Sequence, residues 1–278
     1  MLKLSEIYIY PIKSLGGIHL DVVNINTRGL ENDRRFMLID EKGRFMSQRE
    51  HPQLAIFKTE IEGKFLKITH KKTYQNLTIN LSPPSQSSLL SVTIWDDNTT
   101  AIESSSEASA WFTQALNIPT RLVYMPEESQ RKTDAQYSLT GEEITSFSDG
   151  YPILIIGQSS LDDLNNRLEN PVNINRFRPN FVFTHGEPFE EDNWHEFTVG
   201  NISFFGVKPC ARCIMTTIDQ ETGNKKSKEP LLTLNKYRKA SNKILFGQNV
   251  LISQLGTVSI GDDVTVISRK KLAKFEID

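Results

Sequence analysis

Runs of alternating apolar and polar residues, joined by short polar turns, restrict the fold of this chain more than any other feature. Residues 35–48, 54–70 and 91–102 each contain two such runs around a turn. Because successive side chains of a strand point to opposite faces, an alternating run can bury one face and leave the other in water. A short turn between two runs makes an antiparallel hairpin. The pattern predicts an antiparallel barrel or sandwich.

The second half of the chain continues this pattern. A hairpin is expected at residues 195–207, turning at Gly200-Asn201, and further strands are expected over 249–267. The apolar run Ile153 to Ile156 predicts a buried strand, and "RFRPNFVF" predicts a strand entered through Pro179. The fold class expected is therefore α+β and predominantly β, with a few peripheral helices.

Three segments have helical signals. Residues 104–118 combine a serine-rich start with an apolar side, and 229–240 have a proline near the first turn. A third helix is expected to run through Leu168, with Ser160 and Asp163 as a capping box.

The order of these elements predicts two domains. We expect a β-rich N-terminal domain over residues 1–125 and a β-barrel domain over 147–268. Residues 126–146 are polar and aperiodic, which predicts a linker or mobile loop, and 269–278 form a tail. The first strand could belong to the N-terminal domain or complete the C-terminal barrel.

The charge balance argues against binding to nucleic acid or to an acidic membrane surface. The 278 residues have a formal net charge of −2, whereas such binding needs a basic face. No apolar run reaches the roughly 20 residues needed to span a bilayer. With no export signal and two cysteines, we expect a cytoplasmic location and free thiols.

Both cysteines stand in the segment "VKPCARCIMTTID", residues 207–219. A structural zinc site needs four ligands, and the histidines of this chain are isolated. A thioredoxin-like motif opens a helix, whereas the residues after Cys213 favour a strand. Two inert buried thiols are also possible. The basic neighbours Lys208 and Arg212 favour the thiolate form, which binds soft metals.

Other side chains are hard to explain as solvated charge. Arg176 and Arg178 alternate with Phe177 before an apolar strand, and Arg178 would share a strand face with Asn180. A guanidinium in that place can bind a phosphate or a planar heterocycle, or it can pair with a carboxylate. The chain has no P-loop, no dinucleotide-binding glycine motif and no G-x-S-x-G motif.

Several blocks together resemble a known family. They include "IYPIKSLGG", "GLENDRRFMLID", "SQREHPQL", "SDGYPILIIGQSSLDDLN", "INRFRPNFVF", "VKPCARCIMTTID" and "GTVSIGDDVTVI". In this order they resemble the MOSC superfamily, named after the C-terminal domain of molybdenum-cofactor sulfurase, and within it the bacterial YcbX-like proteins and the mitochondrial amidoxime-reducing component. The resemblance runs from Leu4 to about Ile267 and implies a β-rich N-terminal domain beside a MOSC β-barrel.

The resemblance also implies a molybdenum cofactor, a pyranopterin dithiolene with one phosphate, bound between the two domains. It implies that Cys213 is the catalytic residue and the protein ligand of molybdenum, with Cys210 a neighbour. The residues that the resemblance assigns to cofactor binding are Lys13, Ser14, Arg34, Ser159, Ser160, Arg178, Asn180, Arg212, Gln248 and Asn249.

The function implied is the reduction of N-hydroxylated compounds, namely amidoximes, hydroxylamines and N-hydroxylated bases. Some YcbX-like relatives carry a C-terminal ferredoxin domain, but this chain has no cysteine after Cys213. We therefore expect no iron–sulfur cluster in it and a separate electron donor of the ferredoxin, flavodoxin or flavin reductase type. Asp33 and Asp149 are the nearby candidates for a general acid. The alternative functions are a sulfur carrier and a cofactor-storage protein without turnover.

Overall fold

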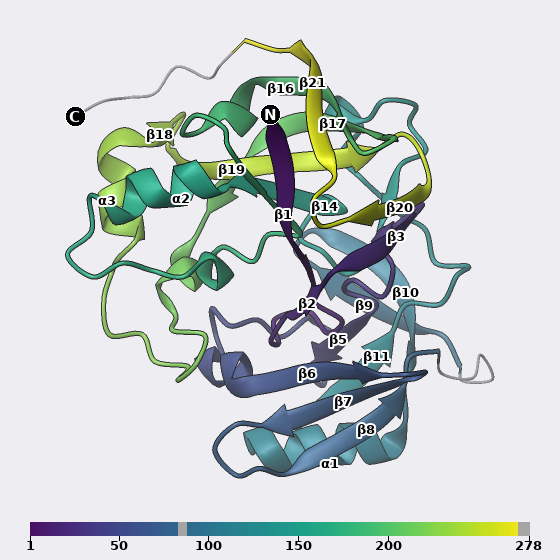
Figure 1. Cartoon of the computed structure of the whole chain (residues 1–278). Coiled ribbons are helices and arrows are strands. Elements are labelled where there is room, and N and C mark those ends of the chain that lie inside the picture. Colours follow the sequence, from purple (N-terminus) through teal and green to yellow (C-terminus); the bar gives the residue numbers. More distant parts are fainter. Residues whose placement is uncertain (83–87, 272–278) are drawn as a thin grey trace.

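A closed barrel of seven strands organises the molecule (Figure 1). The computed structural model describes residues 1–82 and 88–271. In order around the barrel, its strands are β14 (Ile153–Gly157), β15 (Phe181–Thr184), β1 (Leu2–Ile9), β21 (Asp263–Arg269), β16 (Trp194–Val199), β17 (Ile202–Arg212) and β19 (Lys243–Ile252). The barrel is closed because β19 pairs with β14. This strand-dominated architecture confirms the fold class expected from the sequence.

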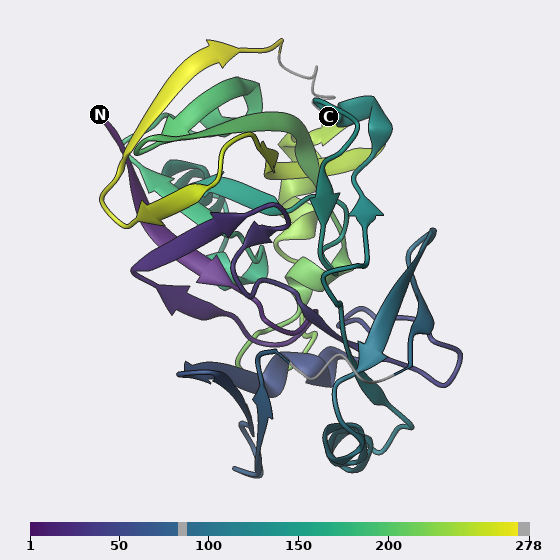
Figure 2. The same ribbon diagram turned by 90° about the vertical axis from the view of Figure 1, so that its right-hand side faces the viewer.

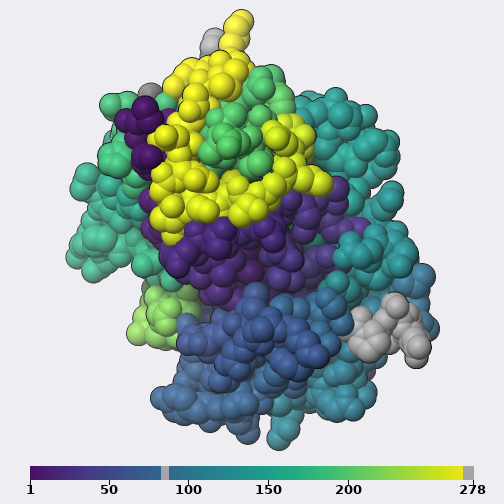
Figure 3. Space-filling view, turned by 45° about the vertical axis from the view of Figure 1, so that its right-hand side comes forward, coloured from purple at the N-terminus to yellow at the C-terminus, as the bar shows by residue number. Residues whose placement is uncertain are grey.

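The first strand of the chain closes this barrel. β1 pairs with β15 through Ile7 opposite Phe181, and with β21 through Leu2 opposite Val264. Figure 3 shows the N-terminal segment between the C-terminal strands and the next part of the chain. Of the two places left open for this strand, it therefore occupies the barrel. The domain limits expected at 125 and 147 stay predictions.

Large apolar side chains fill the barrel. Trp194, Phe197 and Phe204 are fully buried. The Phe197 ring packs against both of the others, with its centroid 5.1 Å from that of Trp194 and 5.7 Å from that of Phe204. Leu4 and Ile7 of β1 belong to the same cluster and are also fully buried. An irregularity in the pairing between Leu4 and Glu6 accounts for the uneven spacing of the buried residues Leu4, Ile7 and Ile9 along this strand.

The residues after β1 build a second region with its own core. Figures 1 and 2 place it below the barrel, with α1 (Ser106–Leu116) at the far end. The hairpins expected at 54–70 and 91–102 are confirmed. The sheets of this region consist of β6 (Phe57–Glu62), β7 (Phe65–His70) and β8 (Asn76–Asn80), and of β5 (Phe36–Ile39), β11 (Arg121–Tyr124), β10 (Asp97–Glu103) and β9 (Leu90–Ile94).

Shorter strands join these two regions. β3 (Val22–Asn26) pairs with β20 (Gly256–Ser259), which comes from the C-terminal part of the chain. The remaining strands are β2 (Ile18–Leu20), β4 (Gly29–Leu30), β12 (Arg131–Lys132), β13 (Ile144–Thr145) and β18 (Lys239–Ala240). The segment expected as a linker or mobile loop thus contains the paired strands β12 and β13, and Arg131 within it is buried.

Three local expectations were wrong. α2 (Gln158–Asn165) has no side-chain cap, because it begins two residues before Ser160 and its N-cap is Gly157; the Ser160 hydroxyl donates instead to the buried carboxylate of Glu191. The residues after Cys213 form a 3₁₀ turn, Ile214–Thr217, rather than a strand. The helix expected to run through Leu168 ends at Asn165. The strand expected from "RFRPNFVF" is present as β15, which begins two residues after Pro179 and follows a 3₁₀ turn at Ile174–Arg176.

The last helix and the tail close the description. α3 (Leu231–Tyr237) starts after Pro230, as expected. The expected tail at 269–278 starts at the end of β21, where Lys270 donates to the carbonyl of Gly206 at 2.8 Å. Most of that tail lies outside the described residues.

Replacing Ile7 with alanine should test the closing role of β1. The side chain is fully buried, so its loss leaves a cavity and should lower the free energy of unfolding by about 2–5 kcal/mol. Urea unfolding measures this difference. Ile267→Ala on β21 is the matched control, because Ile267 is 57% exposed and should change stability by less than about 0.5 kcal/mol. Equal losses would contradict the burial of β1.

Candidate functional site

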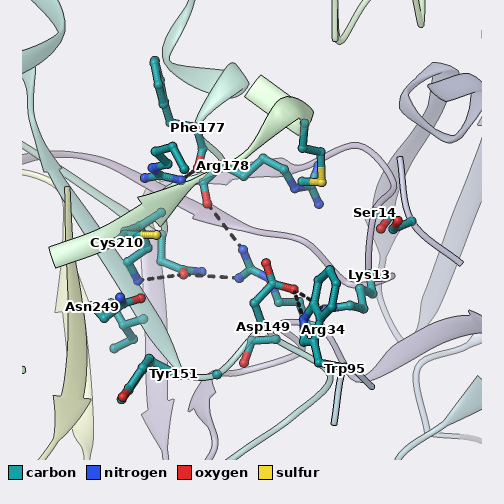
Figure 4. A pocket seen from close by; sticks show the side chains of 18 of the residues that line it. Lys13, Ser14, Arg34, Trp95, Asp149, Tyr151, Phe177, Arg178, Cys210 and Asn249 are labelled. Atoms are coloured by element: carbon teal, nitrogen blue, oxygen red, sulfur yellow. Dashed lines mark hydrogen bonds and ion pairs between the residues drawn. The ribbon is translucent and has the colours of Figure 1, made fainter. Parts of the chain in front are cut away.

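A polar pocket lies where the mouth of the barrel meets the segments that follow β1 and β5 (Figure 4). Its cavity volume is about 100 Å³. Strand ends and loops from both regions supply its walls. The lining residues used below are Lys13, Ser14, Arg34, Phe45, Arg49, Trp95, Asp149, Tyr151, Phe177, Arg178, Asn180, Cys210, Arg212, Met215 and Asn249.

Two arginines of the pocket lining each have one buried donor without a partner in residues 1–82 and 88–271. The Arg178 guanidinium donates from Nη1 to the Leu15 carbonyl at 2.6 Å, and Arg212 donates from Nε and Nη1 to the carbonyls of Phe246 and Phe177 at 2.8 and 2.9 Å. The Nη2 nitrogens of both are buried and have no partner among the described residues. Burial lowers the pKa of Arg178 to about 10, so it stays charged at neutral pH. Unpaired buried cationic donors are costly and favour an anionic ligand.

Tyr10 organises two of the arginines. The guanidinium carbons of Arg178 and Arg34 lie 4.1 and 4.6 Å from the centroid of its ring. The Tyr10 backbone N–H donates to Asp33 at 2.7 Å, and Asp33 forms an ion pair with Arg34. Arg34 also donates to the Asn180 side-chain oxygen at 3.2 Å. Stacking and pairing therefore fix the positions of both guanidinium groups.

Lys13 and Asp149 form an ion pair at the other side of the pocket. The Lys13 Nζ lies 2.7 Å from the Asp149 carboxylate and donates to the Phe147 carbonyl at 2.8 Å. Burial lowers the pKa of Lys13 to about 8, although Asp149 opposes this shift. Burial alone would raise the pKa of Asp149, but Lys13 and a hydrogen bond from Trp95 hold it well below its usual range. Asp149 is thus a carboxylate at neutral pH and a poor general acid.

Four pocket residues have a backbone conformation that residues other than glycine rarely adopt. The φ angles of Ser14, Arg34, Trp95 and Arg178 are 70°, 51°, 55° and 54°. Such positions cost energy and persist only where the surrounding contacts enforce them. Their concentration around one pocket indicates that the fold is strained to aim these side chains.

The two cysteines occupy different environments. Burial raises the pKa of Cys210, which favours its neutral thiol over the thiolate expected from the basic sequence neighbours. Cys213 follows the last residue of β17 and precedes the 3₁₀ turn Ile214–Thr217, at the pocket rim, where its Sγ accepts a hydrogen bond from the Arg49 Nε at 3.2 Å. Both cysteines are free, so the pair forms no disulfide in this structure.

The pocket brings together most of the residues expected from the sequence. Lys13, Ser14, Arg34, Arg178, Asn180, Arg212 and Asn249 line it. Cys213 is not a lining residue, but it follows the lining residue Arg212 and its thiol contacts another, Arg49. Arg178 and Asn180 reach it from the turn before β15, not from a shared strand face as expected.

Three of the residues expected to bind the cofactor do not line the pocket. Ser160 is fully buried and bonded to Glu191, and Gln248 is fully buried inside the barrel. The Ser159 hydroxyl is buried without a partner among the described residues. Their assignment to cofactor binding stays a prediction with less support than that of the other residues.

Sequence reasoning missed several lining residues. Arg49 lies inside the block "SQREHPQL", which carried the family resemblance, but nothing about an exposed arginine after a polar pair pointed to a site. Trp95 was missed because the sequence predicts the hairpin turn at Asp96-Asp97-Asn98, which leaves Trp95 in the preceding strand. In the structure the turn consists of Trp95 and Asp96, since Ile94 pairs with Asp97.

Two further properties bound the site. The described residues contain no cluster of three or more histidine, cysteine, aspartate or glutamate side chains able to hold a metal ion. Among the described helices, none has the length and apolar character needed to cross a membrane.

Comparison with known proteins identifies the family. Residues 1–119 match the model of the MOSC N-terminal beta barrel domain, and residues 142–265 match that of the MOSC domain. The mitochondrial amidoxime reducing component 2 of Bos taurus is 33% identical over 94% of this chain and 82% of that protein. The chain belongs to the MOSC family.

Other relatives extend this finding. This MOSC chain is 29% identical to the mitochondrial amidoxime-reducing component 1 of Homo sapiens, over 95% of its own length and 83% of that protein. It is also 29% identical to the molybdenum cofactor sulfurase of Oryza sativa subsp. japonica, over 96% of its length but 34% of that protein. The family resemblance expected from the sequence blocks is confirmed.

The Asp149→Asn variant should reveal the coupling of Lys13 to Asp149. Without the carboxylate, the pKa of the buried Lys13 should fall below about 8. The variant should therefore be less stable than the parent below pH 8, where Lys13 is charged, and the difference should shrink as the pH rises and the ammonium loses its proton. Urea unfolding at roughly pH 6 and pH 9 measures both values. A stability difference independent of pH would contradict the ion pair.

Proposed function

We propose that this chain binds a molybdenum cofactor in the arginine-lined pocket and uses it to reduce N-hydroxylated compounds. The substrate class is amidoximes, hydroxylamines and N-hydroxylated bases, and the electrons come from a separate ferredoxin, flavodoxin or flavin reductase. Support comes from relatives named as amidoxime-reducing components, from the MOSC domain and from a relative named molybdenum cofactor sulfurase.

One observation carries this proposal: the Nη2 nitrogens of Arg178 and Arg212 are buried without partners in a pocket that has a thiol at its rim. A phosphate and a pterin ring offer the acceptors that planar guanidinium groups prefer. A thiolate is a suitable ligand for a soft metal that already holds dithiolene sulfurs. The donors present therefore fit the cofactor, with Cys213 as the protein ligand of the metal.

The bound cofactor would supply two-electron reduction, so that an amidoxime, two electrons and two protons give an amidine and water. The residues of the chain would orient the cofactor and neutralise its negative charge. Arg178 and Arg212 would hold the anionic groups, Lys13 and Arg34 would add positive charge, and Cys213 would fix the metal at the solvent-facing rim. Because Asp149 stays ionised, solvent at the rim is the better source of protons.

A sulfur-carrier or cofactor-storage role is the second candidate, favoured by the match to molybdenum cofactor sulfurase. It also requires bound cofactor, so cofactor content does not distinguish the two functions. Catalytic turnover of an amidoxime distinguishes them. Anaerobic protein supplied with reduced viologen should convert benzamidoxime to benzamidine if the chain is a reductase, and should not if it only carries or stores.

Substitution of the two cysteines should separate their roles. Protein from a host that makes molybdopterin should carry near-stoichiometric molybdenum by elemental analysis. Cys213→Ser should abolish benzamidoxime reduction, because the metal loses its protein thiolate. Cys210→Ser, the matched control three residues away, should keep most of the metal and activity. An indispensable Cys210, or zinc in place of molybdenum, would refute the assignment.

Arg178→Lys should weaken cofactor retention. Lysine keeps the charge but loses the planar fork and its second donor, so pterin affinity should fall roughly tenfold. Pterin fluorescence after oxidative release measures the content. Arg176→Lys is the control, because Arg176 pairs with Asp219 at 3.1 Å instead of lining the pocket. Equal pterin loss in both variants would count against a specific role for Arg178.

A further inference from the structure

The backbone at Trp95 suits glycine rather than tryptophan. β9 and β10 form a tight hairpin, with Ile94 paired to Asp97, so that Trp95 and Asp96 alone make the turn. The φ angle of Trp95 is 55°, which disfavours a bulky side chain, and hairpin turns of this length commonly place glycine at such a position. A tryptophan in this strained conformation persists only if contacts outside the turn stabilise it.

The strained turn directs the indole into the pocket wall. Its ring packs edge-on against Phe45, with centroids 4.5 Å apart, and its Nε1 donates to the Asp149 carboxylate at 3.2 Å. Figure 4 shows Trp95 beside Asp149 and Lys13. One edge of the ring is therefore anchored by a buried aromatic residue and the polar end by the ion pair described above.

Arg49 covers the face of this ring. Its guanidinium carbon lies 4.2 Å from the indole centroid, and its Nε donates to the Cys213 Sγ at 3.2 Å. The side chain is exposed, and among the described residues its Nη nitrogens have no protein acceptor. One hydrogen bond and one stacking contact thus hold a flat, delocalised group between Trp95 and Cys213.

We propose that Trp95 determines substrate specificity: its indole face receives a flat, conjugated N-hydroxylated group at the place that the Arg49 guanidinium covers in the free protein. This inference rests on the proposed function, because it takes the N-hydroxylated class from there. It adds that aryl amidoximes, hydroxyguanidines and N-hydroxylated bases are preferred over puckered, saturated hydroxylamines.

The geometry supports a flat ligand for two reasons. The group now on the indole is a guanidinium, and an amidoxime or hydroxyguanidine has the same planar, conjugated core. An aromatic face rewards such stacking, whereas a saturated ring cannot lie flat on it. The place is also adjacent to Cys213, so a ligand held there has its N–OH group near the proposed metal end of the pocket.

Binding without turnover gives the most direct test. Isothermal titration with benzamidoxime, in the absence of an electron donor, should give a Kd that rises roughly tenfold in Trp95→Leu. N-cyclohexylhydroxylamine, of similar size but puckered, should bind the parent and the variant alike. Arg49→Ala should lower the Kd for benzamidoxime severalfold, since the competing guanidinium is gone. In steady-state assays, Trp95→Leu should raise the KM for benzamidoxime and leave kcat nearly unchanged.

The controls keep the outcomes distinct. Trp111→Leu alters a tryptophan of α1 that does not line the pocket, and it should leave both Kd values unchanged. If Trp95→Leu does not fold, Trp95→Gly replaces it, because glycine suits the turn. Equal effects on the flat and the puckered ligand, or weaker benzamidoxime binding in Arg49→Ala, would overturn the inference. Suppose instead that benzamidoxime binding depends on Trp95 but neither compound is turned over. That result would support ligand binding on the indole face of Trp95 and contradict the proposed reductase function.

Discussion

The hydrogen bonding of β1 between β15 and β21 is the constraint on which the rest of the structure depends. It fixes the beginning of the chain inside a barrel built from the second half, so the residues that follow must emerge at the barrel mouth. The Tyr8 N–H donates to the Asn180 carbonyl at 2.8 Å, and the Asn180 side chain donates back to the Tyr8 carbonyl at 3.1 Å. Tyr10 and Lys13 are thereby brought against the arginines of the turn before β15.

This arrangement concentrates positive charge in a protein with a net charge of −2. Arg34, Arg178, Arg212 and Lys13 converge on one pocket, and stacking on Tyr10 and bonds to backbone carbonyls hold their side chains in place. Asp149 pairs with Lys13 and Asp33 with Arg34, and within the described part of the chain no group bonds the buried Nη2 nitrogens of Arg178 and Arg212. Preorganised donors of this kind bind an anion without further ordering, which explains why the fold tolerates strained backbone around them.

The sequence predicted the fold better than it predicted side-chain direction. Hairpin periodicity located most strands, because alternation reflects burial of one face. It failed at 214–217, where β-branched and apolar residues form a 3₁₀ turn determined by tertiary contacts. Most of the residues that the family resemblance assigned to cofactor binding line the pocket. The resemblance could not reveal that Ser160 turns toward the buried Glu191, or that Arg49 contacts both Trp95 and Cys213, since these contacts join distant parts of the chain.

The central claim is that Cys213 joins a molybdenum cofactor to the barrel. X-ray absorption at the molybdenum edge tests it most directly, because the sulfur neighbours of the metal can be counted in the intact protein. The account predicts one sulfur fewer around molybdenum in Cys213→Ser than in the parent, and an unchanged count in Cys210→Ser. A sulfur count that falls in Cys210→Ser, or that stays the same in molybdenum-loaded Cys213→Ser, would contradict it.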